Sequence, residues 1–248
     1  MKRGLLIITG VFALSLTSRA QANLVLNTSF EDTVSCPSNI AQMTRATSWA
    51  SFSGSPDYFN ACAPLSNPAH VPYNIAGYQQ ASSGNAYAGF IAYGSQFPNL
   101  REFMGGTLNS QLSIGAKYFV SFNISLSIKP SWSNNCACNN IGALFSTVTY
   151  GSCNGCLPVP KNPQVYTTTL ITDSINWIRI SGSFIADSAY KYIVIGNFFD
   201  NNATDTLIMD GASKCAYAYY YVDDVCVSTD SLTCDGPIGI ETFYPAKE

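Results

Sequence analysis

Short runs of β-branched and aromatic residues follow one another along most of this 248-residue chain, separated by turns rich in Gly, Pro, Asn and Ser. No stretch shows the 3.6-residue apolar period of a helix longer than a turn or two. The predicted strands are residues 23–27, 85–93, 117–128, 142–150, 164–170, 177–184, 192–198 and 217–227. Strands this numerous favour an all-β domain, a β-sandwich or jelly roll with long loops.

The N-terminus has the parts of a secretion signal. A basic start precedes an apolar stretch over residues 4–16, which is too short to span a bilayer, and an A-x-A cleavage signal ends at Ala22. We expect residues 1–22 to be a signal peptide that is removed, and no later apolar run is long enough for a transmembrane segment. The protein is predicted to be secreted or displayed on the outer cell surface.

The charge of the mature part restricts its partners. Without the signal peptide, nine basic residues stand against 15 acidic ones, a net charge of −6. Duplex nucleic acid is excluded as a partner, because phosphate binding requires a concentrated Lys/Arg surface. Only 11% of the residues are charged, whereas Tyr, Asn, Ser, Thr and Gly are abundant. Such a surface suits neutral ligands, including glycans.

Nine cysteines in an exported chain favour disulfides, since that compartment is oxidising. At most eight can pair within the chain, so at least one stays free or pairs with another chain. Cys36 and Cys62 bracket one long loop, and Cys226 and Cys234 flank a short turn after a strand. We expect these two bridges, which would tie the loops to the domain.

Four cysteines in the middle of the chain combine C-x-C with C-x2-C spacing. They are Cys136, Cys138, Cys153 and Cys156. The spacing also resembles a zinc knuckle. Disulfides are favoured over zinc because the run lies in an Asn-, Ser- and Gly-rich hairpin of an exported chain, and their pairing stays open.

Three segments look like excursions from the strands: residues 50–80, 129–160 and 199–216. They are rich in polar and turn-forming residues, and the first two contain cysteines. Long loops in a compact domain are usually functional or disordered, and cysteines argue against disorder. We expect the ligand to meet these loops. One domain over residues 23–234 would then be followed by a linker-like tail, 235–248.

Four short motifs occur in a particular order. Residues 23–32 read NLVLNTSFED and residues 219–227 read YYYVDDVCV; between them, residues 108–122 carry L…L..G..Y.VSF and residues 177–184 carry W..I.G.F. In this order they resemble the strands of jelly-roll carbohydrate-binding modules, of the galactose-binding-like fold, that accompany bacterial xylanases and related glycanases. The resemblance implies a jelly roll that binds a glycan.

A second set of motifs lies in the loops. PDYFNAC at 56–62, VPYNIAGYQ at 71–79, SGNAYAG at 83–89 and REF at 101–103 resemble a group of exported Bacteroidetes surface proteins. In that group, such a domain often precedes a type IX secretion sorting domain or a peptidoglycan-binding domain. No sorting domain follows the tail in this sequence, so we expect either a truncated chain or export by another route.

Acidic side chains occur where the first strand ends and within the last strand: Glu31, Asp32, Asp223 and Asp224. The resemblance implies that they share a structural calcium, an ion that takes six to eight oxygen ligands. Glu31 and Asp223 are the first choices. Strand alternation would put Asp223 on the same face as Val225 and Val227. The alternative is that these acids cap turns or pair with Lys and Arg.

Aromatic side chains are platforms for sugar rings, because the C–H face of a pyranose packs on a ring while its hydroxyls seek amides and carboxylates. The aromatic candidates are Trp49, Tyr58, Phe59, Tyr73, Tyr78 and Trp132. Their polar neighbours are Asn60, Asn74, Gln79 and Arg101. The alternative for each ring is ordinary packing in the core or at its rim.

Signs of catalysis are weak. His70 has no G-x-S-x-G motif or Cys motif beside it. Asp57 and Glu102 could form a glycosidase pair if they met, but the sequence does not bring them together. The chain is predicted to be a non-catalytic extracellular or cell-surface binding module for a glycan. An adhesive or structural envelope protein that binds other proteins is the first alternative, and a glycoside hydrolase the second.

Overall fold

The computed structural model describes residues 22–151 and 156–235. The predicted signal peptide up to residue 21, Cys153 and the tail from residue 236 lie outside the described residues. No described helix is long and apolar enough to cross a membrane.

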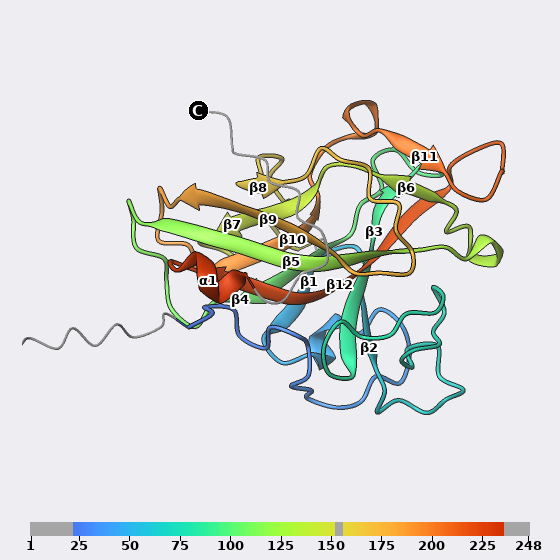
Figure 1. Ribbon diagram of the computed structural model, residues 1–248, viewed down its shortest axis with the longest axis horizontal. Helices are drawn as coiled ribbons and strands as arrows, with labels where there is room; N and C mark the ends of the chain where they lie inside the picture. Colours follow the sequence, from blue (N-terminus) through green and yellow to red (C-terminus); the bar gives the residue numbers. More distant parts are fainter. Residues whose placement is uncertain (1–21, 152–155, 236–248) are drawn as a thin grey trace, which may run out of the picture.

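Two five-stranded antiparallel sheets form a β-sandwich of the jelly-roll type, which confirms the predicted fold class (Figure 1). The first sheet has the order β1 (Trp49–Ser53), β4 (Phe103–Thr107), β10 (Tyr192–Asn197), β7 (Ile141–Ser146) and β8 (Val165–Tyr166). The second has the order β2 (Asp57–Asn60), β3 (Ala86–Gly94), β12 (Tyr217–Ser228), β5 (Lys117–Ser127) and β9 (Ile178–Ile185). A small third sheet joins β6 (Cys136–Cys138) to β11 (Thr206–Ile208).

The described helices are short. They are η1 (Met43–Arg45), η2 (Pro130–Trp132), η3 (Asn201–Ala203) and α1 (Ser231–Cys234). Each is about one turn long, as the lack of a helical apolar period predicts.

The central strand β12 shows how the sequence fills two layers. Tyr220 and Val222 point into the main core between the sheets, whereas Tyr219 and Tyr221 point to the outer face of the second sheet. The register shifts between Asp223 and Cys226, where Asp224 has a left-handed φ of 52°. This β-bulge returns the following valines to the core and leaves Asp223 on the tyrosine face. The predicted placement of Asp223 beside those valines is therefore wrong.

The predicted strand positions agree well in the second half of the chain and less well in the first. Residues 23–27 form only one isolated bridge, Val25 with Leu108. Residues 50–80, expected to be a loop, contain β2 and most of β1. These strands are four and five residues long, which is too short for a clear alternating pattern among Ser and Pro.

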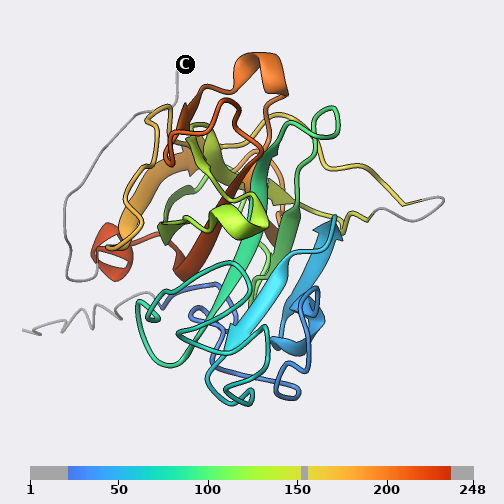
Figure 2. The same cartoon turned by 90° about the vertical axis from the view of Figure 1, so that its right-hand side faces the viewer.

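A long loop covers the outer face of the second sheet. Residues 61–85 connect β2 to β3, and in Figures 1 and 2 this teal segment runs along the lower part of the molecule beside β2. Loop residues Ala69, Val71 and Ala76 pack on the buried rings of Tyr87 and Tyr221. The loop therefore has its own apolar cluster and leaves part of the tyrosine face uncovered.

Two predicted disulfides are confirmed. Cys36–Cys62 and Cys226–Cys234 have Cα–Cα distances of 5.6 Å and 5.4 Å, within the ~4.4–6.8 Å range of disulfides. The first ties the long loop to the segment before η1, and the second ties α1 to β12.

We expected all four middle cysteines to form disulfides, with their pairing left open, and for Cys138 this is wrong. Cys136 is bridged to Cys215, 79 residues away, and Cys138 is a buried free thiol. Cys156 is also disulfide-bonded. The zinc-knuckle alternative is wrong, because Cys136 is already in a disulfide and no group of three or more His, Cys, Asp or Glu in the described chain could hold a metal ion.

Candidate functional site

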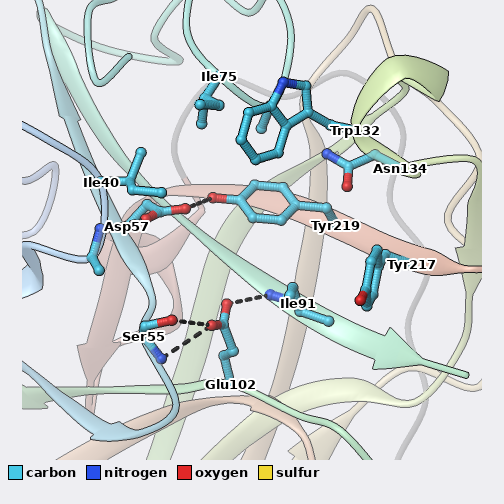
Figure 3. Close-up of a pocket in the computed structure, with 12 residues that line it drawn as sticks. Ile40, Ser55, Asp57, Ile75, Ile91, Glu102, Trp132, Asn134, Tyr217 and Tyr219 are labelled. Carbon is cyan, nitrogen blue, oxygen red and sulfur yellow. Dashed lines mark hydrogen bonds between the residues drawn. The ribbon is translucent and has the colours of Figure 1, made fainter. Parts of the chain in front are cut away.

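A pocket of about 230 Å³ opens on the outer face of the second sheet, beside the long loop (Figure 3). Two buried carboxyl groups, Asp57 and Glu102, line it, and we call it the acid pocket. Its other lining residues are Ile40, Ala41, Ser55, Ile75, Ala76, Ile91, Trp132, Asn134, Tyr217 and Tyr219. Asp57 and Glu102 are 45 positions apart, so only the fold brings them together.

Asp57 is fixed by two short hydrogen bonds. The Ala41 N–H donates to its Oδ1, and the Tyr219 hydroxyl donates to its Oδ2, both at 2.6 Å. Gly89 lies on β3, between strand β2 of Asp57 and strand β12 of Tyr219. A Cβ at Gly89 would stand 2.3 Å from the Tyr219 hydroxyl oxygen. A glycine at this position therefore lets the phenol reach across β3. Burial raises the pKa of Asp57 to about 6; the hydrogen bonds from Tyr219 and Ala41 oppose this shift, and nearby Glu102 adds a small part of it.

Glu102 joins three segments of backbone. Its Oε1 accepts from the N–H and hydroxyl of Ser55 at 3.0 and 2.9 Å, and its Oε2 accepts from the Ile91 N–H at 2.9 Å. Burial raises the pKa of Glu102, while these hydrogen bonds lower it. Both acids in the pocket are thus shifted toward the neutral form.

Aromatic rings form the other walls. Figure 3 shows the indole of Trp132 beside the phenol ring of Tyr219, with Tyr217 on the same strand. Trp132 is 51% exposed. It lies in the one-turn helix η2, which is followed by Ser133 in the left-handed conformation. The pocket therefore offers both an open ring face and buried acceptors.

Trp132 also lines a shallow depression of about 470 Å³ next to the acid pocket. Ile75 is shared by the two as well. The other lining residues of this Trp132 depression are Ser66, Asn67, Pro68, Tyr73, Asn74, Gly77 and Lys129. The two hollows therefore adjoin each other at Trp132 and Ile75.

Three predicted platforms are corrected. Trp49, Tyr58 and Phe59 lie in strands β1 and β2 and are buried. The Trp49 indole packs on Phe30, and the Tyr58 hydroxyl donates to the Phe30 carbonyl. These rings belong to cores on both faces of the second sheet, so they cannot stack on a sugar.

The predicted polar neighbours are also buried: Asn60, Asn74, Gln79 and Arg101. Asn60 binds the Tyr58 hydroxyl and the Cys62 N–H, while Asn74 binds Tyr87 and the turn that follows it. Their amides satisfy buried loop groups, which would otherwise be unpaired. The buried His70 has the same kind of role, with its Nδ1 2.7 Å from the Ala63 carbonyl oxygen.

Tyr73 and Tyr78 are exposed, by 66% and 51%, as platform residues should be. Their rings pack edge to face with centroids 4.7 Å apart. Of the two, Tyr73 lines the Trp132 depression. Tyr73 is therefore the candidate platform, and Tyr78 supports it.

The predicted calcium ligands contact backbone donors. Glu31 accepts from the Asn85 and Ala86 N–H groups, and Asp223 accepts from those of Ser82, Ser83 and Asp224. A Cβ at Gly84 would lie 2.3 Å from the Glu31 carboxylate, so a glycine is required there. Asp32 is exposed, and Asp224 binds Ser83 and Asn123.

These carboxylates are engaged by backbone N–H groups of the protein. The described residues contain no acidic group of three that could hold a metal. Calcium binding stays a prediction.

The lining residues that were not predicted from the sequence include Tyr217, Tyr219 and Asn134. The tyrosines alternate with Ala218 and Tyr220 along one strand, so period-two spacing could have placed them on a common face. Asn134 follows η2 in a turn, and no sequence signal marks it.

No protein-family model matches the sequence, and no curated protein does either. The solved structures to which the chain is similar include the enzymatically active domain of bacteriophage CBA120 tailspike protein 4, at 8% identity and a TM-score of 0.36. The match covers 83% of this chain and 21% of the tailspike chain.

The CBM22-1 and GH10 modules of endo-1,4-β-D-xylanase 10B from Clostridium thermocellum, complexed with xylohexaose, share 9% identity at a TM-score of 0.39, over 89% of this chain and 30% of that one. The K3 cleaved adhesin domain of Lys-gingipain from Porphyromonas gingivalis shares 12% sequence identity at a TM-score of 0.37. The match covers 84% of this chain and 99% of that domain. The chain thus spans less than a third of the first two structures. The identities are too low to carry a function to this chain.

Proposed function

We propose that this protein is a non-catalytic glycan-binding module, secreted or displayed on the cell surface, and that it binds through the acid pocket and the Trp132 depression. The observation that carries the proposal is the half-exposed Trp132 indole, which is shared by the two hollows. Its ring can pack on the C–H face of one sugar unit while polar groups on either side accept hydroxyls. The disulfides support an oxidising, extracellular compartment.

Rigid surroundings favour binding by these rings. The Cys36–Cys62 bridge and the buried Asn74 hold the long loop that carries Tyr73. A loop that is already ordered loses less conformational entropy when a ligand binds.

Binding is favoured over catalysis because of what the two acids already contact. A glycosidase requires one carboxyl to protonate the leaving oxygen and the other to attack or activate water. In the acid pocket, each carboxyl oxygen of Asp57 and Glu102 accepts at least one hydrogen bond from the protein. Both groups therefore hold backbone in place as well as facing the pocket.

The proposal is tested by a glycan-array screen of residues 23–248, followed by calorimetry with the best ligand. Trp132→Ala and Tyr73→Ala are each expected to weaken binding by about tenfold or more, since truncating a central contact costs ~1.4 kcal/mol per tenfold. Tyr166→Ala is the matched control, because Tyr166 is a partly exposed ring on β8 of the other sheet.

Three results would contradict the proposal. Unchanged affinity in Trp132→Ala would place the site elsewhere. A screen without any glycan hit, combined with a protein partner, would favour the adhesive alternative. Cleavage of a polysaccharide that Glu102→Gln abolishes would make the protein a glycoside hydrolase.

A further inference from the structure

The acid pocket contains two carboxyl groups whose negative charge, once they are ionised, is not neutralised by a cation of the lining residues. The donors that reach Asp57 and Glu102 in the described chain are all neutral: three backbone N–H groups and the hydroxyls of Ser55 and Tyr219. None of the lining residues is Lys, Arg or His. Burying carboxyl groups without a cation is costly, so a cation would be bound favourably there.

The basic residues nearest in sequence or space are directed elsewhere. Arg101 precedes Glu102, but its guanidinium donates to the Leu100 carbonyl, Asn201 and Thr204, and it lies 5.1 Å over the Tyr93 ring. Lys129 lines the Trp132 depression, and its Nζ donates to the Asn74 carbonyl at 3.0 Å. Neither Arg101 nor Lys129 therefore neutralises the carboxyl groups of the acid pocket. The missing positive charge can come from a ligand.

The pocket has acceptors and ring faces left for such a ligand. An ionised carboxylate can accept about four hydrogen bonds. Asp57 accepts two and Glu102 accepts three from the protein. Trp132, Tyr217 and Tyr219 stand around the same space, and aromatic faces attract cations.

We infer that the acid pocket receives the protonated amine of an amino sugar, so that the glycan this module binds carries free amino groups. The inference rests on the proposed function, because the rest of the glycan would occupy the Trp132 depression. With a volume of about 230 Å³, the pocket is smaller than the ~300–1,000 Å³ of sites for larger ligands. It suits one small unit rather than a chain.

A sugar amine is favoured over the amine of a peptide by the chemistry of the adjoining depression. Its volume of about 470 Å³ is lined by the exposed ring of Tyr73 and by Ser66 and Asn67. A ring face beside hydroxyl and amide groups matches a sugar unit, which has an apolar face and a hydroxyl rim.

The test compares three β-1,4-linked hexamers that differ at one substituent: glucosamine, N-acetylglucosamine and glucose. They are titrated calorimetrically into the mature protein at a pH above the pKa of about 6 of Asp57, so that its carboxyl is ionised, and below the pKa of the glucosamine amines, so that these are protonated. We expect the glucosamine hexamer to bind at least about tenfold tighter than the other two.

Two variants test whether the carboxyl groups of the acid pocket cause the preference for the glucosamine hexamer. Asp57→Asn and Glu102→Gln remove one charge each, and either is expected to reduce the preference to less than about threefold. Asp187→Asn is the control, because Asp187 is an exposed acid in the turn between β9 and β10. Thermal unfolding checks that each variant folds; if neither pocket variant does, the three hexamers decide on the native protein.

Equal binding of the three hexamers would overturn the amino-sugar inference and leave the glycan-binding proposal standing. No binding of any hexamer or array glycan would contradict both. Polylysine that binds the native protein as tightly as the glucosamine hexamer, and loses affinity in Asp57→Asn, would show that the pocket selects amines of any kind, and the assignment to a sugar would be wrong.

Discussion

Two pairs of carboxyl groups contact strands of the second sheet, and the two pairs have different surroundings. Glu31 and Asp223 accept five backbone N–H groups between them: three at the end of the loop before β3, one from Ala86 at the start of β3, and one from Asp224. Asp57 and Glu102 also accept backbone donors, but both face a pocket with a half-exposed tryptophan. The first pair attracted attention in the sequence because it lies in the strand-end motifs. The second pair lines the acid pocket.

The difference lies in what each pair leaves open. Carboxylates at the loop end meet donors within a few residues of each other, so they act as a clamp on residues 82–86. The pocket pair joins the segments of Ala41, Ser55 and Ile91, and a cavity remains between them. A carboxyl group is therefore a candidate for function when it borders space, and not merely when it is buried.

The largest effect is expected from breaking the clamp. Asp223→Ala removes a buried carboxyl that accepts from three partly buried N–H groups, and it should lower the free energy of unfolding by about 3 kcal/mol. Asp223→Asn, which keeps one acceptor oxygen, should lose less. Urea denaturation measures both, and Asp32→Ala, a change at an exposed acid, should stay within about 0.5 kcal/mol.

The same clamp decides the predicted calcium. If calcium contributes, a chelator lowers the melting temperature of the native protein, and Asp223→Ala removes this sensitivity. An unchanged melting temperature would assign these carboxylates to the loop amides alone.

The pocket pair should make stability depend on pH. The pKa of Asp57 rises from 3.8 to about 6 on folding, so its contribution is fully present below pH ~4 and is lost as the pH rises through about 6. The free energy of unfolding should fall by roughly 2–3 kcal/mol over this range on account of Asp57.

The raised pKa values of Glu102 and Asp223 act in the same direction. Asp57→Asn should therefore show a smaller fall in stability with pH, measured by urea denaturation at a series of pH values. An identical fall in the native protein and in Asp57→Asn would show that the pocket acid is not the source.

The smallest change in stability is expected at Trp132. Its side chain is half exposed and lies outside the buried clusters, so Trp132→Ala should change the free energy of unfolding by no more than about 0.5 kcal/mol. The same variant should lose most of the glycan affinity. A loss of stability comparable to that of Asp223→Ala would mean that the ring is structural.

Local features were predictable from the sequence. The Cys226–Cys234 bridge spans eight residues around one turn, and the long strands β5 and β12 carry an apolar pattern that is visible without a structure. Most contacts between distant parts of the chain were not predictable. Cys136 and Cys215 are 79 residues apart, and no local spacing joins them.

The site itself depends on such non-local meetings. Asp57 reaches Tyr219 across β3 because Gly89 leaves room, and neither the strand order nor that gap can be read from a single sequence. The bulge at Asp224 likewise shifts the alternation of β12 by one residue. Tyr58 and Phe59 were misplaced because a four-residue strand between Pro56 and Cys62 carries too few residues to show a period.

The buried free thiol of Cys138 can serve as a natural probe of local unfolding. It lies on β6, is fully buried, and burial raises its pKa to about 12. An alkylating reagent reacts with the thiolate, so labelling at this position has to wait until the strand opens to solvent. The rate of its labelling would then report how often the centre of the sandwich opens, without any engineered probe.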